Sequence, residues 1–167
     1  TTAGLEWLAD GEAGMNQRLD PLARALALPI WHGKPHAEPL GGGITNLNVL
    51  VTDDKRRAVV RIGDDIPVHQ IMRFNELAAS RAAHAAGISP AVIYHEPGAL
   101  VIDFVAGRTM TAADLREPDL LGQALALVRR THHDIPRHLR GPALTFWVFQ
   151  TLRDYAVELQ LQAPDHY

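Results

Sequence analysis

The sequence predicts an α+β protein in which a twisted antiparallel sheet of about five strands carries one long helix and is followed by further helices. Short segments with apolar residues at every second position recur between residues 31 and 105, separated by glycine and proline. One stretch rich in helix-forming residues, from Val68 to Ala86, interrupts them. After Gly107 the apolar residues recur at helical spacing, so the last part of the chain is expected to be helical.

The composition fits one globular domain and argues against several classes of protein. With 167 residues, 47% of them hydrophobic, the chain is long enough to bury a core. It has no cysteine, so disulfides and thiolate metal sites are ruled out, and a reducing compartment such as the cytoplasm is the expected location. A net charge of -3 provides no basic surface field, so nucleic acid is not an expected partner.

The sequence gives no signal for export or for a membrane span. The only apolar residues close to the start are Leu5, Trp7 and Leu8, too few for the core of a signal peptide. No apolar run approaches the ~20 residues that a membrane-spanning helix needs. Residues 1–18 are treated as an N-terminal segment without an assigned structure.

The first expected elements are a short helix and an irregular strand. Asp20 and Pro21 predict a helix start, because aspartate caps the first turn and proline is tolerated there. Pro29 ends this helix. Residues 31–40 are expected to contain a strand that leads into the glycines 41–43.

A β-hairpin, the long helix and two more strands are expected next. Apolar and polar residues alternate over 47–52, and a second apolar run covers 58–62 after a polar stretch. The segment 68–86 is predicted to be one helix, with the glycine that follows it as a left-handed cap. Strands over 91–94 and 100–105 are joined by a turn whose Pro-Gly pair suits type II, so the sheet is expected to be antiparallel.

Helices are expected beyond this sheet. Thr111 and Asp114 resemble a capping box with aspartate in place of the usual glutamate. A proline at 118 opens a helix predicted to run to about His132, with leucine and valine on one face. Aromatic and aliphatic residues then recur at helical spacing over 146–159, where they indicate core or a contact surface that is exposed in an isolated chain.

The glycine-rich segment is the first candidate for ligand binding. Gly41, Gly42 and Gly43, followed by Thr45 and Asn46, stand between two extended segments. Glycines let a backbone approach a phosphate closely and expose its N–H donors. No Gly-Lys-Ser/Thr follows as in a P-loop, and a strand rather than a helix comes next, which excludes the dinucleotide fingerprint. A flexible turn is the alternative interpretation, and a glycine-rich hairpin over phosphates is the functional one.

Val59 and Arg61 add a second feature of a nucleotide site. They share one strand face by the period of two, which puts an apolar group and a cation on the same side. Val59 is placed to cover an adenine while Arg61 reaches its phosphates, because guanidinium binds phosphate in a fork geometry. A solvated arginine on an exposed strand face is the alternative.

Glu76 adds a third feature, on the long helix. It is the only charge on a stripe that also contains Met72, Ala79 and Ala83. A carboxylate in an apolar stripe is stabilised by a cation, and Arg61 is the expected partner. An exposed glutamate on an alanine-rich helix is the alternative.

The order of these features resembles the amino-terminal lobe of kinases, and in particular the choline and ethanolamine kinase branch of the aminoglycoside-phosphotransferase-like superfamily. The resemblance covers about Leu19 to Tyr155. Its most specific motifs are Leu40-Gly41-Gly42-Gly43-Ile44-Thr45-Asn46, Val59-Val60-Arg61-Ile62-Gly63, Asn75-Glu76, Ala86-Gly87-Ile88-Ser89-Pro90 and the hinge-like run from Val101 to Thr109. Arg61 favours this branch, because relatives outside it usually carry lysine there.

The resemblance implies a kinase-like N-lobe over residues 19–105 and, over 106–167, a hinge with the first helices of a C-lobe. It implies ATP and Mg²⁺ as cofactors and transfer of the γ-phosphoryl group to the hydroxyl of a small alcohol, with choline or ethanolamine favoured. Thr45 and Asn46 are then expected near phosphate, and the backbone from Asp103 to Val105 is expected to bind the adenine.

The chain departs from the family pattern after His133. The family's catalytic segment, His-x-Asp-x-x-x-x-Asn followed by a metal-binding aspartate, is not found there, and no asparagine follows Asn75. His132-His133-Asp134 does not replace it, so this polypeptide alone is not expected to turn over substrate. The histidines 132, 133 and 138 are interpreted as surface residues rather than a metal site, because neighbouring helix positions face different ways.

Three other functions stay open at this point. One is a non-catalytic nucleotide-binding or scaffolding module, and another is an aminoglycoside-type kinase. The third is an unrelated α+β binding domain. The oligomeric state is not predicted.

Overall fold

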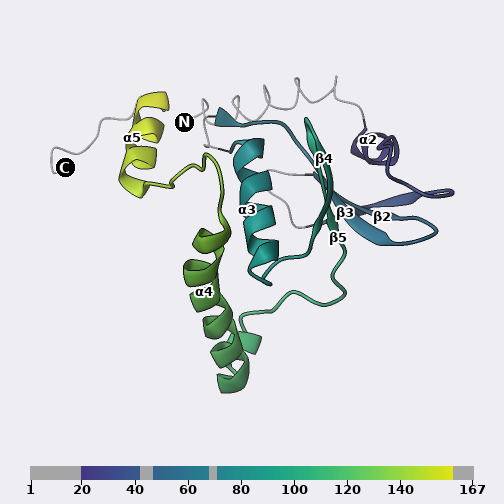
Figure 1. Ribbon diagram of the computed structural model, residues 1–167. Helices are drawn as coiled ribbons and strands as arrows, with labels where there is room; N and C mark the ends of the chain where they lie inside the picture. Colours follow the sequence, from purple (N-terminus) through teal and green to yellow (C-terminus); the bar gives the residue numbers. More distant parts are fainter. Residues whose placement is uncertain (1–19, 42–46, 68–70, 160–167) are drawn as a thin grey trace, which may run out of the picture.

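The computed structural model describes residues 20–41, 47–67 and 71–159. Five strands form one sheet in the order β1-β2-β3-β5-β4, and every neighbouring pair is antiparallel (Figure 1). The strands are β1 (His36–Leu40), β2 (Leu47–Thr52), β3 (Arg57–Ile62), β4 (Val92–Glu96) and β5 (Ala99–Asp103). The predicted α+β fold, an antiparallel five-stranded sheet with one long helix, is confirmed.

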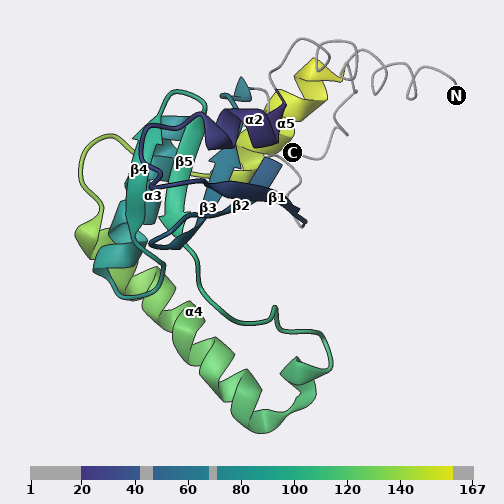
Figure 2. The same cartoon turned by 90° about the vertical axis from the view of Figure 1, so that its right-hand side faces the viewer.

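Helices lie against both faces of this sheet. The short α2 (Pro21–Leu26) covers one face and the longer α3 (Arg73–Ala85) lies on the other, as Figure 1 and Figure 2 show from two sides. Because alternate strand residues point to opposite faces, each strand contributes to both layers. The layer on the α2 side holds the fully buried side chains Val49, Val51, Val60 and Val101. This layer, between the sheet and α2, is the hydrophobic core.

The first helix is fixed at both of its ends. The side chain of Asp20 accepts the N–H of Leu22 at 3.1 Å, which confirms the predicted cap. Arg24, in the last turn, forms an ion pair with Glu96 of β4, and the hydroxyl of Tyr94 donates to the same carboxylate at 2.6 Å. The Tyr94 hydrogen bond and then the Arg24 guanidinium lower the pKa of Glu96 below its ordinary value.

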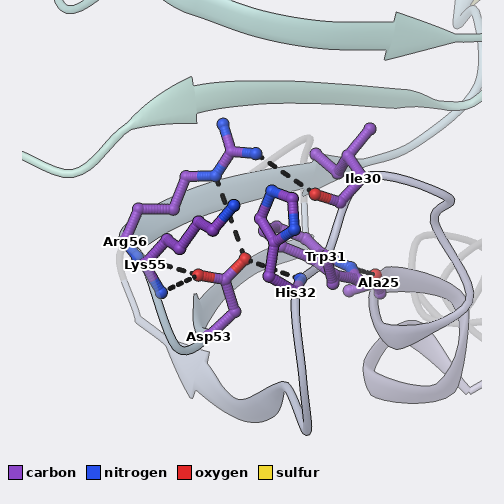
Figure 3. A network of polar contacts seen from close by, with 7 residues as sticks. All are labelled: Ala25, Ile30, Trp31, His32, Asp53, Lys55 and Arg56. Atoms are coloured by element: carbon purple, nitrogen blue, oxygen red, sulfur yellow. Dashed lines mark hydrogen bonds and ion pairs between the residues drawn. The ribbon is translucent and has the colours of Figure 1, made fainter.

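A buried carboxylate ties the β2–β3 turn to the segment before β1 (Figure 3). Asp53 accepts the backbone N–H groups of Lys55 and Arg56 at 2.8 Å and that of His32 at 3.0 Å. Arg56 in turn donates to the carbonyl of Ile30 at 3.1 Å. Burial alone would raise the pKa of Asp53, but the three amides and the Arg56 charge lower it below its ordinary value. The turn between two central strands is therefore held by a charged, fully paired acceptor.

The long helix starts later than predicted. It begins at Arg73 rather than at 68, because Ile71 pairs with Ile66 in an antiparallel bridge. Their backbone N–H groups donate to each other's carbonyls, at 2.8 and 3.1 Å, so the chain is extended just before the helix. The part of the prediction that covers 68–70 lies outside the described residues.

Two glycines end elements as the sequence predicts. Gly87 follows α3 with φ +68°, and Gly98 lies in the β4–β5 turn with φ +79°, the value that a type II turn needs at its third position. The predicted strand ends are off by two residues. β4 continues to Glu96, which pairs with Ala99 directly across the turn, whereas β5 ends at Asp103 where its neighbouring strands also stop.

The segment after the sheet begins with a capping box. The N–H of Asp114 donates to the hydroxyl of Thr111 at 3.3 Å, and the N–H of Thr111 donates to the Asp114 carboxylate at 2.6 Å. This confirms the predicted box, although it opens only the 3₁₀ turn η2 (Asp114–Arg116). Arg108 binds both carboxylate oxygens of Asp114, and this pairing, with the Thr111 hydrogen bonds, holds the pKa of Asp114 far below its usual range.

Two helices complete the described chain, α4 (Pro118–His138) and α5 (Val148–Glu158). The predicted end of α4 at His132 is wrong. Asp134 lies 3.7 Å from Arg130 and 3.6 Å from Arg137 along the helix surface, and this spacing stabilises the additional turns. Within the described residues, no helix is both long and apolar enough to cross a membrane.

Candidate functional site

The candidate site starts on β3, at the strand face that looks toward α3. Strand pairing puts Arg61 opposite Asn48 of β2 and Leu100 of β5. Val59 lies two residues earlier on β3 and pairs with β2 and β5 in the same register. Residues two apart on a strand point to the same face, so Val59 and Arg61 lie on one side of the sheet. The buried Val60 between them faces the α2 side. The period-two prediction is therefore correct for this strand.

The expected contact between strand and helix is present. Nη1 of Arg61 lies 3.0 Å from Oε1 of Glu76, and the two side chains are 35% and 18% exposed. Glu76 lies in the first turn of α3, where its negative charge is also favoured by the helix dipole. The cation is thus more exposed than the carboxylate that orients it. The roles of both residues in nucleotide binding stay a prediction.

Arg73 is a third member of the site that the sequence analysis missed. Its Nη1 lies 2.8 Å from Oε2 of Glu76, so each carboxylate oxygen of Glu76 has its own guanidinium. The i, i+3 spacing of the two residues on a helix is the signal that pointed to this contact.

The glycine-rich segment is described only at its first residue. Gly41 is exposed at the end of β1, and a Cβ added there would meet nothing within 4 Å. Crowding therefore gives no reason for glycine at this position. The other predicted residues of the segment, Gly42, Gly43, Thr45 and Asn46, lie outside the described residues, and their contact with phosphate stays a prediction.

The expected adenine-binding backbone has two of its three amides in use. The N–H of Asp103 donates to Ala91 at 3.0 Å, and the N–H of Phe104 donates to Arg57 at 3.2 Å. The Arg57 guanidinium also lies over the Phe104 ring, 4.0 Å from its centroid. Of the three predicted residues, Val105 is the one whose amide is in none of the backbone hydrogen bonds found for the described part of the chain, and the residue is 66% exposed.

A pocket of about 330 Å³ adjoins the ion pairs on the side of β5 and β4. Arg61, Arg73 and Glu76 are among the polar residues that line it, and Phe74, Leu77, Pro97 and Leu100 are among the apolar ones. Neither Val59 nor Val105 contributes to it. The pocket is therefore distinct from the predicted position of the adenine.

Within the described residues, no group of three or more histidine, aspartate or glutamate side chains is arranged to hold a metal ion. Asp134, the acid of the sequence His132-His133-Asp134, is engaged by Arg130 and Arg137. These pairings engage Asp134 on the surface of α4, where His132 and His133 are exposed.

Two solved structures share the architecture. A choline/ethanolamine kinase family protein from Mesorhizobium loti is 30% identical, with a TM-score of 0.61 over 86% of this chain and 46% of that one. The ethanolamine kinase of Plasmodium vivax is 16% identical, with a TM-score of 0.59 over 75% of this chain and 37% of that one, and shows only a common fold. No curated protein sequence matches the chain.

These similarities define the class of protein. The antiparallel sheet with its long helix is a kinase-like N-terminal lobe. Residues 36–165 match the model of the phosphotransferase enzyme family called APH, and the chain belongs to that family. It spans less than half the length of either solved relative.

Proposed function

We propose that this chain is the ATP-binding part of a phosphotransferase that transfers the γ-phosphoryl group of ATP to the hydroxyl of a small alcohol. The observation that carries the proposal is the 3.0 Å contact between Arg61 and Glu76. In kinases, a cation held by a helix carboxylate binds the α- and β-phosphates. A guanidinium suits this role because its planar donors match phosphate oxygens. Membership of the phosphotransferase family supports the same reaction class.

Each predicted site residue has a part in this proposal. Arg61 binds the phosphates, Glu76 orients Arg61, and Val59 covers one face of the adenine. The Val105 amide, which the strand pairing leaves available, donates to an adenine nitrogen. The segment Gly41–Asn46 brings its backbone N–H groups to the phosphates.

Choline and ethanolamine are the proposed acceptors. The similarity to a choline/ethanolamine kinase family protein at 30% identity and the shared fold with an ethanolamine kinase favour them over an aminoglycoside. The presence of arginine rather than lysine at position 61 supports the same branch. A cytoplasmic location, where ATP is available, remains part of the proposal.

The described residues support the nucleotide in this proposal, but they contain no three-ligand group for its metal. A guanidinium and a neighbouring apolar strand residue are available for ATP. A divalent cation would neutralise charge on the transferred phosphoryl group. Because the described residues provide no ligand group for it, we assign no step of the reaction to a metal held by them. We place the metal ligands and the catalytic base in the part of the relatives that this chain does not cover.

The proposal also sets the division of the chain. Residues 19–105 would form the N-lobe, and 106–167 the hinge and first helices of a second lobe, with 1–18 unassigned. Arg108 and Asp114, joined by two short hydrogen bonds, lie at the start of the second part.

The first test is nucleotide binding by this chain, measured by titration with a fluorescent ATP analogue. We expect saturable binding that Arg61→Met weakens by about tenfold or more, the loss of one charge-assisted contact. Arg153→Met, at an exposed position on α5, should change the affinity less than twofold. Equal affinity of the wild type and Arg61→Met would contradict the assigned role.

The second test concerns the acceptor. A product of the same gene that includes the His-x-Asp-x-x-x-x-Asn segment is given Mg-ATP with choline, ethanolamine or an aminoglycoside, and ADP release is measured. Turnover with choline or ethanolamine is the expected result. Phosphorylation of the aminoglycoside alone would move the chain to another branch of the family.

A further inference from the structure

A single carboxylate is held between two guanidiniums that come from different elements. Oε1 of Glu76 accepts from Arg61 of β3 at 3.0 Å, and Oε2 accepts from Arg73 of α3 at 2.8 Å. With only one partner, a carboxylate can rotate about its terminal bond, because that torsion is broad. With a separate partner on each oxygen, its plane is fixed. The direction in which Oε1 presents itself to Arg61 therefore depends on Arg73.

Arg73 is itself anchored more firmly than Arg61. Its Nε donates to the carbonyl of Asp64 at 2.9 Å, and its backbone N–H donates to the carboxylate of Asp65 at 2.6 Å. Its side chain is 20% exposed, against 35% for Arg61. Arg73 thus connects the segment that follows β3 to the first turn of α3, and it provides a fixed point from which Glu76 can be held.

The location of Arg73 is unfavourable for the helix alone. The N-terminal end of a helix carries partial positive charge, so a cation in the first turn is disfavoured there. The side-chain contacts with the carbonyl of Asp64 and with Glu76 offset this cost. A side chain that opposes the helix dipole but is held by these two hydrogen bonds is explained better by its geometry than by helix stability.

We propose that Arg73 is a positioning residue, which fixes the carboxylate of Glu76 so that the Arg61 guanidinium stays directed at the nucleotide phosphates. This inference rests on the proposed nucleotide function for its consequence, but not for the geometry. Arg73 acts through Glu76 and touches no substrate in this assignment. Without Arg73, the carboxylate of Glu76 can rotate together with the Arg61 guanidinium. The guanidinium then has no single orientation in the ligand-free protein.

The first experiment measures ATP-analogue affinity in Arg73→Gln, with Arg81→Gln as the matched control. Arg81 lies on the same helix, is exposed and loses the same charge. We expect Arg73→Gln to weaken binding by about tenfold and Arg81→Gln by less than twofold. In a Glu76→Gln background, Arg73→Gln should add almost nothing, because the route through Glu76 is already lost. An additive double variant would show that Arg73 acts independently of Glu76 and would overturn the proposal.

The second experiment needs no nucleotide. The Nε–Hε resonance of Arg61 is recorded by ¹⁵N NMR in the ligand-free protein. We expect it to shift and broaden in Arg73→Gln and to remain unchanged in Arg81→Gln. If this holds while the wild type binds no ATP analogue, the proposed function fails and the positioning role stands.

A conservative variant separates positioning from folding. Arg73→Lys keeps a charge for Glu76 but loses the Nε donor to Asp64, so we expect the same changes at about half the size or less. This variant carries the test if Arg73→Gln has no cooperative melting transition. A folded variant with unchanged Arg61 resonance and unchanged affinity would overturn the inference.

Discussion

Val59 and Val60, neighbours on β3, lie on opposite faces of the sheet. Val59 is half-buried on the face that holds Arg61, whereas Val60 is fully buried on the α2 side. Val59→Ala and Val60→Ala would remove the same atoms from opposite faces of the sheet, so each variant is a control for the other.

We expect Val60→Ala to lower the free energy of unfolding by about 2 kcal/mol, because it leaves a cavity in a closely packed layer. Val59→Ala should cost less stability but weaken ATP-analogue binding about fivefold through lost apolar contact. Chemical denaturation and nucleotide titration measure the two effects. An equal loss of affinity in both variants would place Val59 outside the site.

The sequence allowed the Arg61–Glu76 contact to be predicted for a simple reason. The period of two sets the face of a strand residue, and the period of 3.6 sets the face of a helix residue. Partner choice is harder. Arg73 was missed because a cation three positions before a glutamate is common on exposed helices, and sequence spacing cannot show that a loop carbonyl and a second carboxylate also hold it.

At the scale of elements, α3 is held at both ends by the segment that follows the sheet. Nη2 of Arg130 on α4 donates to the carbonyl of Ala86 at 2.9 Å, where the last carbonyls of α3 lack helical partners. At the other end, the side-chain carbonyl of Asn75 accepts the N–H of Leu144 at 3.0 Å. Because Asn75 directly precedes Glu76, the segment before α5 contacts the helix beside the carboxylate that pairs with Arg61.

We expect Arg130→Met to destabilise the C-terminal turn of α3, at a cost of about 1 kcal/mol, the net value of one such hydrogen bond. Hydrogen exchange of the amides at 84–88 should become faster. Arg129→Met is the control, since Arg129 is exposed on the same helix. Unchanged protection in Arg130→Met would mean that α4 does not support this end of the helix.

The start of α3 shows that backbone pairing can override the helix propensity of the local sequence. Helix-forming residues before Arg73 predicted an earlier start for α3, but the Ile66–Ile71 bridge keeps the chain extended there. The two hydrogen bonds of that bridge join residues that no propensity scale relates. The turns and caps at Asp20, Gly87 and Gly98 were predictable because their conformations depend on one or two residues.

For the whole molecule, we expect low pH to reduce the stability of the fold through three carboxylates. Their pKa values are lowered in the folded state: Asp53, Glu96 and Asp114. The unfolded chain then binds protons at a higher pH than the folded chain does. The stability they provide is complete above their ordinary pKa values of 3.8 and 4.5 and is lost as pH falls through the lowered ones.

We therefore expect the melting temperature to fall steeply below about pH 4.5. Thermal melts between pH 5 and 2 measure this. Glu96→Gln should make the decline shallower, because its carboxylate no longer titrates, and it should lower stability at neutral pH by breaking the contact with Arg24. A slope identical to that of the wild type would exclude Glu96 as a contributor.

The helices beyond the sheet expose large apolar residues that the rest of the described chain leaves uncovered. This exposed apolar surface of the two helices comes from residues that are each at least 40% exposed, on α4, on α5 and just before α5: Leu121, Leu125, Val128, Phe146, Phe149 and Leu152. Such area is unusual on a monomer, and a net charge of -3 on 167 residues provides little repulsion between copies. We expect this chain to self-associate as its concentration rises, with sedimentation coefficients that increase over a dilution series. Phe146→Ser combined with Phe149→Ser should return it toward the monomer, whereas Met110→Ser, at an exposed apolar position outside this surface, should leave association unchanged. If the double variant associates as strongly as the wild type and Met110→Ser do, the exposed apolar residues of α4 and α5 do not join the copies.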